Sequence, residues 1–404
     1  MILTVFLLTA SLAVGEVVCR FLPPLIQRYR NSNQKHLDFV DVVFSNGMVM
    51  SGFLRPNCDN LLIDGYGKLI RWKNNAFGFR YNKEISLKPD NGVIRTLLLG
   101  DSFVVGYRID QKAMFSVLLE NYFNNKKDGK KYEILPADID EPYFGLRYLS
   151  NFGIKFEPSI VILGITLGND LFQNYAVTRE NIGYILHPST RHFFAPGNNY
   201  VISEEITIIP SKYLVPKRIK IEDNVSIFNR FMLYRTLLGW SKKYQGEEIC
   251  SYFEDNQPRL HEVCVGYGIH LKESPEEINE SYKKFFETLS SYKELSERYR
   301  FKLIVVIFPQ RFQVQKEDWT ATVNGCGLNK DCFDLMKPNN LILDYCKKAG
   351  IVCLDPTSQM TAIYEKKGRS LYFPLRDMHW NSSGHRALFD SVKERVYEII
   401  SSGQ

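Results

Sequence analysis

The sequence predicts an α/β fold: a parallel sheet with helices on its faces, plus one insertion. Short apolar runs at residues 94–99, 132–137, 159–164, 302–308 and 351–354 are the expected strands. Near-continuous hydrophobic runs of this length are typical of strands buried on both faces of a sheet. Expected helices lie between them, and this alternation favours parallel βαβ units.

Apolar periodicity and capping residues indicate the helices. Residues 114–123 form an amphipathic stretch, and a helix is expected over 145–152. In the run Ser274-Pro275-Glu276-Glu277, the serine suits an N-cap, the proline a first helical position and the last acid a capping box. The final helix is expected over about residues 383–400.

Changes in pattern along the chain predict its domain organisation. Residues 1–22 form an apolar segment, and residues 23–90 mix short β-like runs with turns. The α/β pattern covers 91–171 and 274–404, and is interrupted at 172–273 by an irregular stretch. We interpret this stretch as an insertion that caps the edge of the sheet.

The apolar segment Met1–Leu22 contains Glu16 and Arg20 as its only charges. Its length suits a membrane-spanning helix, although Ser11–Ala13 also offers a small-residue cleavage site for a signal peptide. The missing basic start of the segment favours an uncleaved anchor. Basic residues after the segment favour a cytoplasmic body, whereas the cysteine spacing favours an extracytoplasmic one, which is the location we expect.

The cysteines form two close pairs in polar segments, Cys250 with Cys264 and Cys326 with Cys332. Such pairs are common as disulfides outside the cytoplasm, and the alternative of free thiols stays open. Cys346 and Cys353 flank an expected core strand and are interpreted as buried thiols.

The charge balance argues against a nucleic-acid partner. The chain has 51 basic and 45 acidic residues, for a net charge of +6, and shows no dense Lys/Arg stripe. No CxxC pair or histidine cluster suggests a metal, and no cofactor is expected. A nucleotide-binding Rossmann domain is set aside because no GxGxxG run follows the first strand.

Two candidate site blocks follow expected strands, where open α/β sheets place their ligands. Gly100-Asp101-Ser102 ends the first strand, and a serine at such a turn is exposed near backbone amides that can receive an oxyanion. Asn169 follows the third strand and can donate a side-chain hydrogen bond to an oxyanion. Read singly, each block is also a plain turn or helix cap.

The third block is Asp377-Met378-His379-Trp380-Asn381, ahead of the final helix. A histidine beside a carboxylate can be held in the tautomer that accepts a serine proton. We therefore expect Ser102 as nucleophile, His379 as base and Asp377 as the residue that orients the imidazole. Asp101 and Asp170 are expected to hold loops rather than react.

In these blocks the sequence resembles the SGNH/GDSL hydrolases, which are named for Ser, Gly, Asn and His in separate blocks. Ser102, Asn169 and His379 match three of these positions. The run Asn74-Asn75-Ala76-Phe77-Gly78-Phe79-Arg80 upstream resembles membrane-tethered bacterial members. The resemblance implies a three-layer α/β/α, flavodoxin-like fold and an ester-acting enzyme that needs no metal or cofactor.

The sequence departs from the family pattern in two places. Asp377 and His379 are separated by one residue instead of two, a DxHW spacing that also occurs in alginate-type O-acetyltransferases. The glycine of the second block is missing, and Asp138 stands in its region. The backbone N–H of Asp138 is a candidate oxyanion donor beside the backbone N–H of Ser102 and the side-chain amide of Asn169, but its carboxylate opposes an oxyanion.

The expected function is therefore a serine esterase acting on an acylated small molecule or glycan, such as O-acetyl groups of an envelope polysaccharide. A polysaccharide O-acyltransferase with the same site is the first alternative. A catalytically impaired, membrane-tethered binding protein of the same fold is the second.

Overall fold

The computed structural model describes residues 39–43, 49–54, 56–66, 68–139, 141–171, 265–326, 328–373 and 378–401. The predicted membrane segment 1–22, most of the predicted insertion 172–273, and Asp377 lie outside these residues. No helix within the described ranges is long and apolar enough to cross a membrane.

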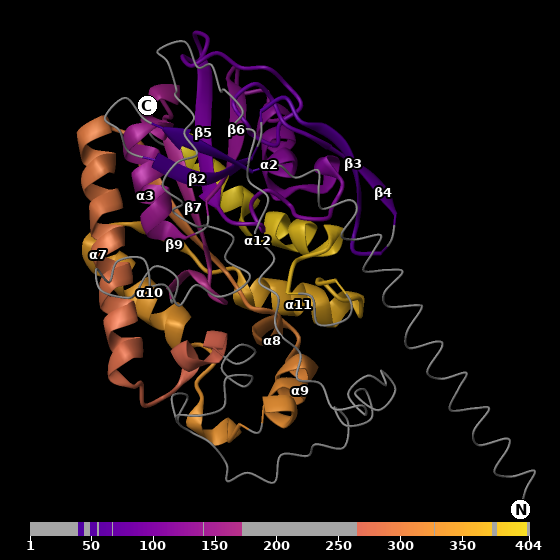
Figure 1. The fold of residues 1–404 in the computed structure, drawn as a ribbon, viewed down its shortest axis with the longest axis vertical. Coiled ribbons are helices and arrows are strands. Elements are labelled where there is room, and N and C mark those ends of the chain that lie inside the picture. The colour runs from indigo at the N-terminus through magenta and orange to yellow at the C-terminus, as the bar shows by residue number, and fades with distance from the viewer. Residues whose placement is uncertain are drawn as a thin grey trace, which may run out of the picture. The chain divides into compact units, whose positions relative to one another are not determined.

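A five-stranded parallel sheet forms the centre of the described fold (Figure 1). Its strands are β5 (Val93–Gly100), β6 (Lys131–Asp138), β7 (Ile160–Thr166), β8 (Lys302–Phe308) and β9 (Val352–Leu354). Their spatial order is β6-β5-β7-β8-β9, and every neighbouring pair is parallel. Numbered by chain order this is 2-1-3-4-5, the order of flavodoxin-like folds. The predicted α/β class and all five predicted strands are confirmed.

One face of the sheet is covered by α3 (Pro142–Asn151), η2 (Gly153–Phe156), α7 (Glu276–Tyr299) and α10 (Lys337–Ala349) (Figure 1). Alternate strand residues such as Leu97, Leu163 and Val305 face these helices and are fully buried. The side chains of a strand point to opposite faces in turn, so the residues between them face the other layer.

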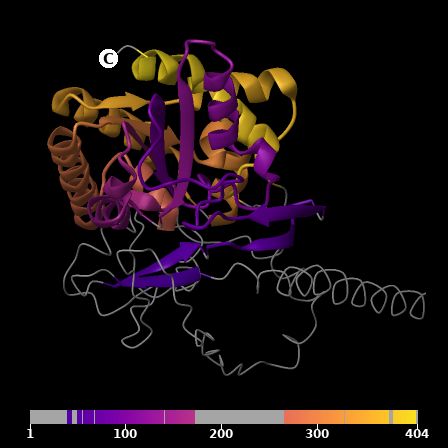
Figure 2. The same cartoon turned by 90° about the horizontal axis from the view of Figure 1, so that it is seen from above.

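The opposite face is covered by α2 (Phe115–Asn124), α11 (Thr357–Lys367) and α12 (Ser382–Ser401), which pack on residues such as Leu98 and Ile162 (Figure 2). Helices on both faces confirm the three-layer arrangement. The strands β5, β7 and β8 are buried along nearly their whole length, which explains why the sequence shows them as largely apolar runs.

Two antiparallel hairpins precede the sheet in the chain. The first pairs β1 (Phe39–Val43) with β2 (Val49–Leu54), and the second pairs β3 (Asp59–Ile63) with β4 (Leu69–Lys73). In the second hairpin, Leu62, Ile70 and Trp72 form a small buried cluster. The β-like pattern seen at the start of the sequence therefore corresponds to real strands.

The start predicted for α7 is wrong in detail. The helix begins at Glu276, with Pro275 in the cap position and no side-chain capping bond. The Ser274 hydroxyl instead accepts a hydrogen bond from Lys337 Nζ at 2.7 Å. A tertiary contact with the start of α10 thus replaces the predicted local cap.

Several helices between β8 and α12 have no counterpart in the prediction. They are α8 (Arg311–Val314), α9 (Lys316–Cys326), α10 and α11. The 3₁₀ segments η1 (Gln111–Ala113), η4 (Val265–His270) and η5 (Lys330–Cys332) complete the described elements. Cys346 carries a buried free thiol as predicted, whereas the free thiol of Cys353 is only half-buried. Cys332 is disulfide-bonded.

Candidate active site

The strand order reverses between β5 and β7, because β6 lies on the other side of β5. In open α/β sheets, ligands bind outside the carboxyl ends of the strands at this switch point. Ser102 lies two residues beyond the end of β5, and Asn169 lies three residues beyond the end of β7. The topology therefore brings two of the predicted site blocks to one edge of the sheet.

The turn that carries Ser102 is organised by its neighbour Asp101. Asp101 Oδ1 accepts from the backbone N–H of Phe103 at 3.0 Å, and the Asp101 carbonyl accepts from the N–H of Val104 at 2.9 Å. A Cβ on Gly100 would lie 2.4 Å from a methyl group of Val104, so only glycine allows this close return of the chain. The Ser102 side chain is half-buried at the surface of this turn.

Ser102 and His379 are in direct contact. Ser102 Oγ lies 2.9 Å from His379 Nε2, within the range that a general base needs for proton transfer. The imidazole stacks on the ring of Phe103, with centroids 5.3 Å apart and an interplanar angle of 27°. The ring of Tyr107 lies 5.1 Å from it at a tilted angle. Two residues of the nucleophile turn thus orient the predicted base.

A short antiparallel bridge between two segments of the chain holds His379 in place. Tyr372 and Trp380 form an antiparallel bridge, and the N–H of Phe373 donates to the carbonyl of His379 at 3.0 Å. Asn381 Oδ1 accepts from the N–H of Ser383 at 2.8 Å and thereby caps α12.

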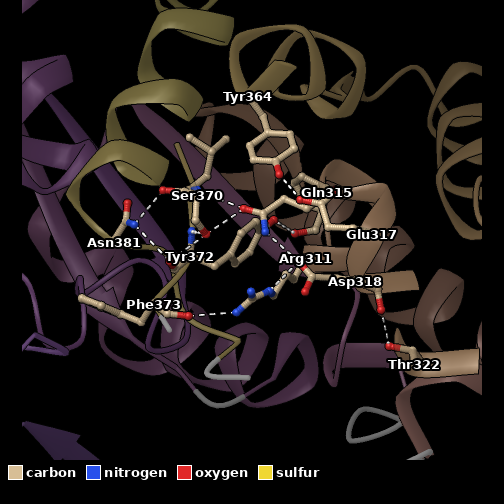
Figure 3. A network of polar contacts seen from close by, with 12 residues as sticks. Arg311, Gln315, Glu317, Asp318, Thr322, Tyr364, Ser370, Tyr372, Phe373 and Asn381 are labelled. Atoms are coloured by element: carbon tan, nitrogen blue, oxygen red, sulfur yellow. Dashed lines mark hydrogen bonds and ion pairs between the residues drawn. The ribbon is translucent and has the colours of Figure 1, made fainter. Parts of the chain in front are cut away.

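A polar network holds the segment of this bridge that contains Tyr372 (Figure 3). The amide of Asn381 donates to the carbonyls of Ser370 and Tyr372 at 2.8 and 3.0 Å. Arg311 donates to the carbonyl of Phe373 at 2.8 Å and pairs with Asp318 at 2.7 Å. Phe373, whose N–H bonds the His379 carbonyl, is therefore anchored to α8 and α9.

Asp101 also joins the two switch-point strands. Its Oδ1 accepts from Thr166 Oγ1 at 3.1 Å, and its Oδ2 lies 3.5 Å from the amide nitrogen of Asn169. Asp170 Oδ2 accepts from the N–H of Thr166 at 2.7 Å. Burial raises the pKa of Asp101 above its usual range. Asp101 and Asp170 thus hold the loops, as expected from the sequence.

The structure places the remaining predicted site residues as follows. The half-buried Asn169 directs its amide toward Asp101 and lies at the same sheet edge as Ser102. Asp138 ends β6 in register with Gly100, and its side chain is half-buried. Asp377 lies outside the described residues, so its orienting role stays a prediction.

Sequence reasoning missed three residues that surround this site. Phe103 and Tyr107 contact the imidazole of His379, and Arg80 binds the turn that carries them. Arg80 ends the run 74–80, which carries part of the family resemblance. The sequence feature that could have indicated a role for Arg80 is its position beside a glycine and two phenylalanines.

His385 is fully buried, and its Nδ1 accepts from the N–H of Phe115 at 3.3 Å. Burial lowers the pKa of His385 to about 3, so the ring is neutral. Within the described part of the chain, no group of three or more His, Cys, Asp or Glu residues is placed to hold a metal ion.

No protein-family model matches the sequence, and no curated protein sequence matches it. Among solved structures, an acetyl xylan esterase is 12% identical, with a TM-score of 0.39, over 75% of this chain and all (100%) of that chain. TesA is 8% identical, with a TM-score of 0.36, over 75% of this chain and 97% of that one. A GDSL-like lipase from Bacteroides thetaiotaomicron is 10% identical, with a TM-score of 0.32, over 76% and 88% respectively. Likenesses this weak lend no weight to a function, which has to be argued from the site.

Proposed function

We propose that this chain is a serine esterase of the SGNH/GDSL type that acts on acyl esters, in particular O-acetyl groups of an envelope glycan. One observation carries the proposal: Ser102 Oγ and His379 Nε2 lie 2.9 Å apart at the switch point of a parallel sheet. A serine paired with a histidine at this distance is the arrangement needed for nucleophilic catalysis.

The proposed reaction follows from the chemistry of these groups. His379 accepts the hydroxyl proton as Ser102 Oγ attacks the ester carbonyl, and Asp377 orients the imidazole. The N–H groups of Ser102 and Asp138 and the amide of Asn169 stabilise the tetrahedral anion. His379 returns the proton to the leaving alcohol, and the acyl group remains on Ser102 until a water releases it as the acid.

Transfer to a sugar hydroxyl shares the first half of this reaction. The DxHW spacing of Asp377 and His379 is the feature that favours it. In the structure, however, Trp380 is buried against Phe103 and Phe308, at centroid distances of 4.8 and 5.0 Å. This tryptophan supports the nucleophile turn by packing, a role that serves hydrolysis and transfer equally.

The proposal also includes tethering to a membrane through residues 1–22 and an extracytoplasmic location. Both rest on the apolar sequence of that segment and on the cysteine spacing. Digestion of the chain by a protease added to intact and to permeabilised cells tests the location.

Hydrolysis of p-nitrophenyl acetate by the full-length chain, beside its Ser102→Ala variant, tests the activity. We expect turnover that disappears with the serine. Mass spectrometry after treatment with a fluorophosphonate should place the adduct on Ser102. If the folded wild type is neither active nor labelled, ester hydrolysis fails and the binding-protein alternative takes its place.

A further inference from the structure

Arg80 is a fully buried arginine whose guanidinium binds backbone carbonyls. Nη1 donates to the carbonyls of Val105 and Gly106 at 2.8 and 2.5 Å, and Nη2 donates to that of Ile109 at 2.6 Å. The guanidinium carbon lies 3.8 Å from the ring centroid of Trp72. Burial lowers the pKa of Arg80 to about 9, so the group stays charged at neutral pH.

The three carbonyls all belong to the turn that follows Ser102. This turn is unusual in its backbone, because Gly106 and Arg108 both have positive φ angles, of 63° and 62°. A non-glycine residue in this left-handed region is strained. The guanidinium supplies hydrogen bonds that stabilise this conformation, and its removal would leave buried carbonyls without those donors.

The same turn supplies the groups around the reacting atoms. The N–H of Tyr107 donates to the carbonyl of Ser102 at 2.9 Å, so the turn closes directly on the serine. The rings of Phe103 and Tyr107 contact the imidazole of His379. A shift of this turn would therefore move the nucleophile and the support of the base together.

We propose that Arg80 is a positioning residue for the reaction at Ser102, acting through the turn 102–109. The inference rests on the proposed esterase function and extends it to Arg80. The hydrogen bonds of Arg80 given above go to the turn and not to Ser102 or His379. Arg80 holds three carbonyls of the turn by hydrogen bonds, and the turn in this conformation places Ser102 beside His379. Arg80 should accordingly affect the chemical step more than the overall stability.

Arg95 is a natural matched control. It is also fully buried, and its Nη1 donates to the carbonyls of Ser86, Leu87 and Phe156 at 3.0, 2.7 and 3.1 Å. It pairs with Glu133 at 2.9 Å. Arg95 lies near the start of β5, whereas Ser102 follows the end of that strand. The two arginines thus make similar bonds at opposite ends of one strand.

The test compares the full-length wild type with Arg80→Lys and Arg95→Lys. The measurements are the rate of fluorophosphonate labelling of Ser102, kcat and KM for p-nitrophenyl acetate, and the thermal unfolding midpoint. A lysine has one ammonium in place of the rigid, planar fork with which Nη1 and Nη2 of Arg80 reach three carbonyls. We expect Arg80→Lys to slow both labelling and kcat about 10- to 100-fold with little change in KM, since small displacements of reacting groups have effects of this size.

Arg95→Lys should lower the unfolding midpoint as much as Arg80→Lys does, but leave the labelling rate within about twofold of wild type. Equal labelling rates for the two variants would overturn the inference while leaving Ser102 established as nucleophile. A wild type that is inert would overturn the proposed function, and this inference with it.

If Arg80→Lys does not fold, Trp72→Phe provides the second test. This change retains the guanidinium but reduces the ring on which it lies. Slower labelling of Ser102 in a folded Trp72→Phe protein would support the positioning role. Labelling at the wild-type rate would contradict it.

Discussion

Thr166 Oγ1 donates a 3.1 Å hydrogen bond to Asp101 Oδ1, and this bond joins the last residue of β7 to the residue that precedes Ser102. Both residues are buried. Hydrogen bonds to charged groups are stronger than those between neutral groups. The position of the nucleophile turn therefore depends on the neighbouring strand, as well as on its own sequence.

Replacing Thr166 with valine should weaken both the fold and the reaction. The change removes the hydroxyl and retains a similar volume, so we expect a loss of about 1.5–3 kcal/mol in the free energy of unfolding. We also expect a lower kcat. Denaturant unfolding and kinetics on p-nitrophenyl acetate measure both. Thr288→Val is the control, since the Thr288 hydroxyl donates only to the carbonyl of Lys284 in its own helix.

Asn169→Ala should lower kcat for ester hydrolysis by about 10²- to 10³-fold with KM nearly unchanged, because the amide is proposed to bind the oxyanion. Asn151→Ala is a suitable control. That side chain bonds the carbonyl of Arg147 at 2.7 Å at the end of α3. A loss of activity that is equal in the two variants would speak against an oxyanion role for Asn169.

Asp138→Asn retains the backbone N–H and removes the negative charge. A charge about 4 Å away costs about 1 kcal/mol even in water, which corresponds to about a fivefold change in rate. We expect kcat to rise by about that factor. Glu297→Gln on the exposed part of α7 controls for the change in net charge. A lower kcat for Asp138→Asn would show that the carboxylate assists the reaction.

Arg311→Met should release Phe373, whose N–H bonds the carbonyl of His379. It removes the bond to the Phe373 carbonyl and leaves Asp318 without its arginine partner (Figure 3). We expect a lower kcat and a lower unfolding midpoint. Lys316→Met removes the exposed pair with Glu365 and should change neither, because exposed ion pairs contribute little. Wild-type kinetics in a stable Arg311→Met protein would exclude a role for this network in holding His379.

The stability of the fold should fall in mild acid. Burial lowers the pKa of His385 to about 3 and that of His270 to about 4, from an ordinary value of 6.5. Between pH 6.5 and 4 the unfolded chain therefore binds more protons than the folded one. The free energy of unfolding should decrease as pH falls, by up to about 1.4 kcal/mol per pH unit for each histidine.

Urea unfolding between about pH 7 and 4.5 measures this slope. His385→Asn keeps an acceptor for the N–H of Phe115 and removes the titrating ring, so its slope should be smaller than that of the wild type. An identical slope would mean that other groups cause the acid sensitivity.

Much of the fold was predictable because its signals are local. The run from Leu97 to Leu99 is apolar and fully buried because both faces of β5 are covered. The amphipathic pattern of α2 is also visible directly in the sequence. By contrast, α11 buries only Thr357 and Met360 among its residues, so its sequence shows little apolar periodicity. Such helices form because tertiary contacts stabilise them, and local pattern does not indicate them.

The sequence by itself determined the fold class, the positions of the strands and the residue types of the candidate site, since burial and turn chemistry leave local traces. Only the tertiary structure decided that Ser102 and His379 meet across 277 positions of the chain. The tertiary structure alone also places the guanidinium of Arg80 against the carbonyls of the turn that follows Ser102. Distances of this kind depend on strand order and on packing between remote segments, and no short stretch of sequence encodes them.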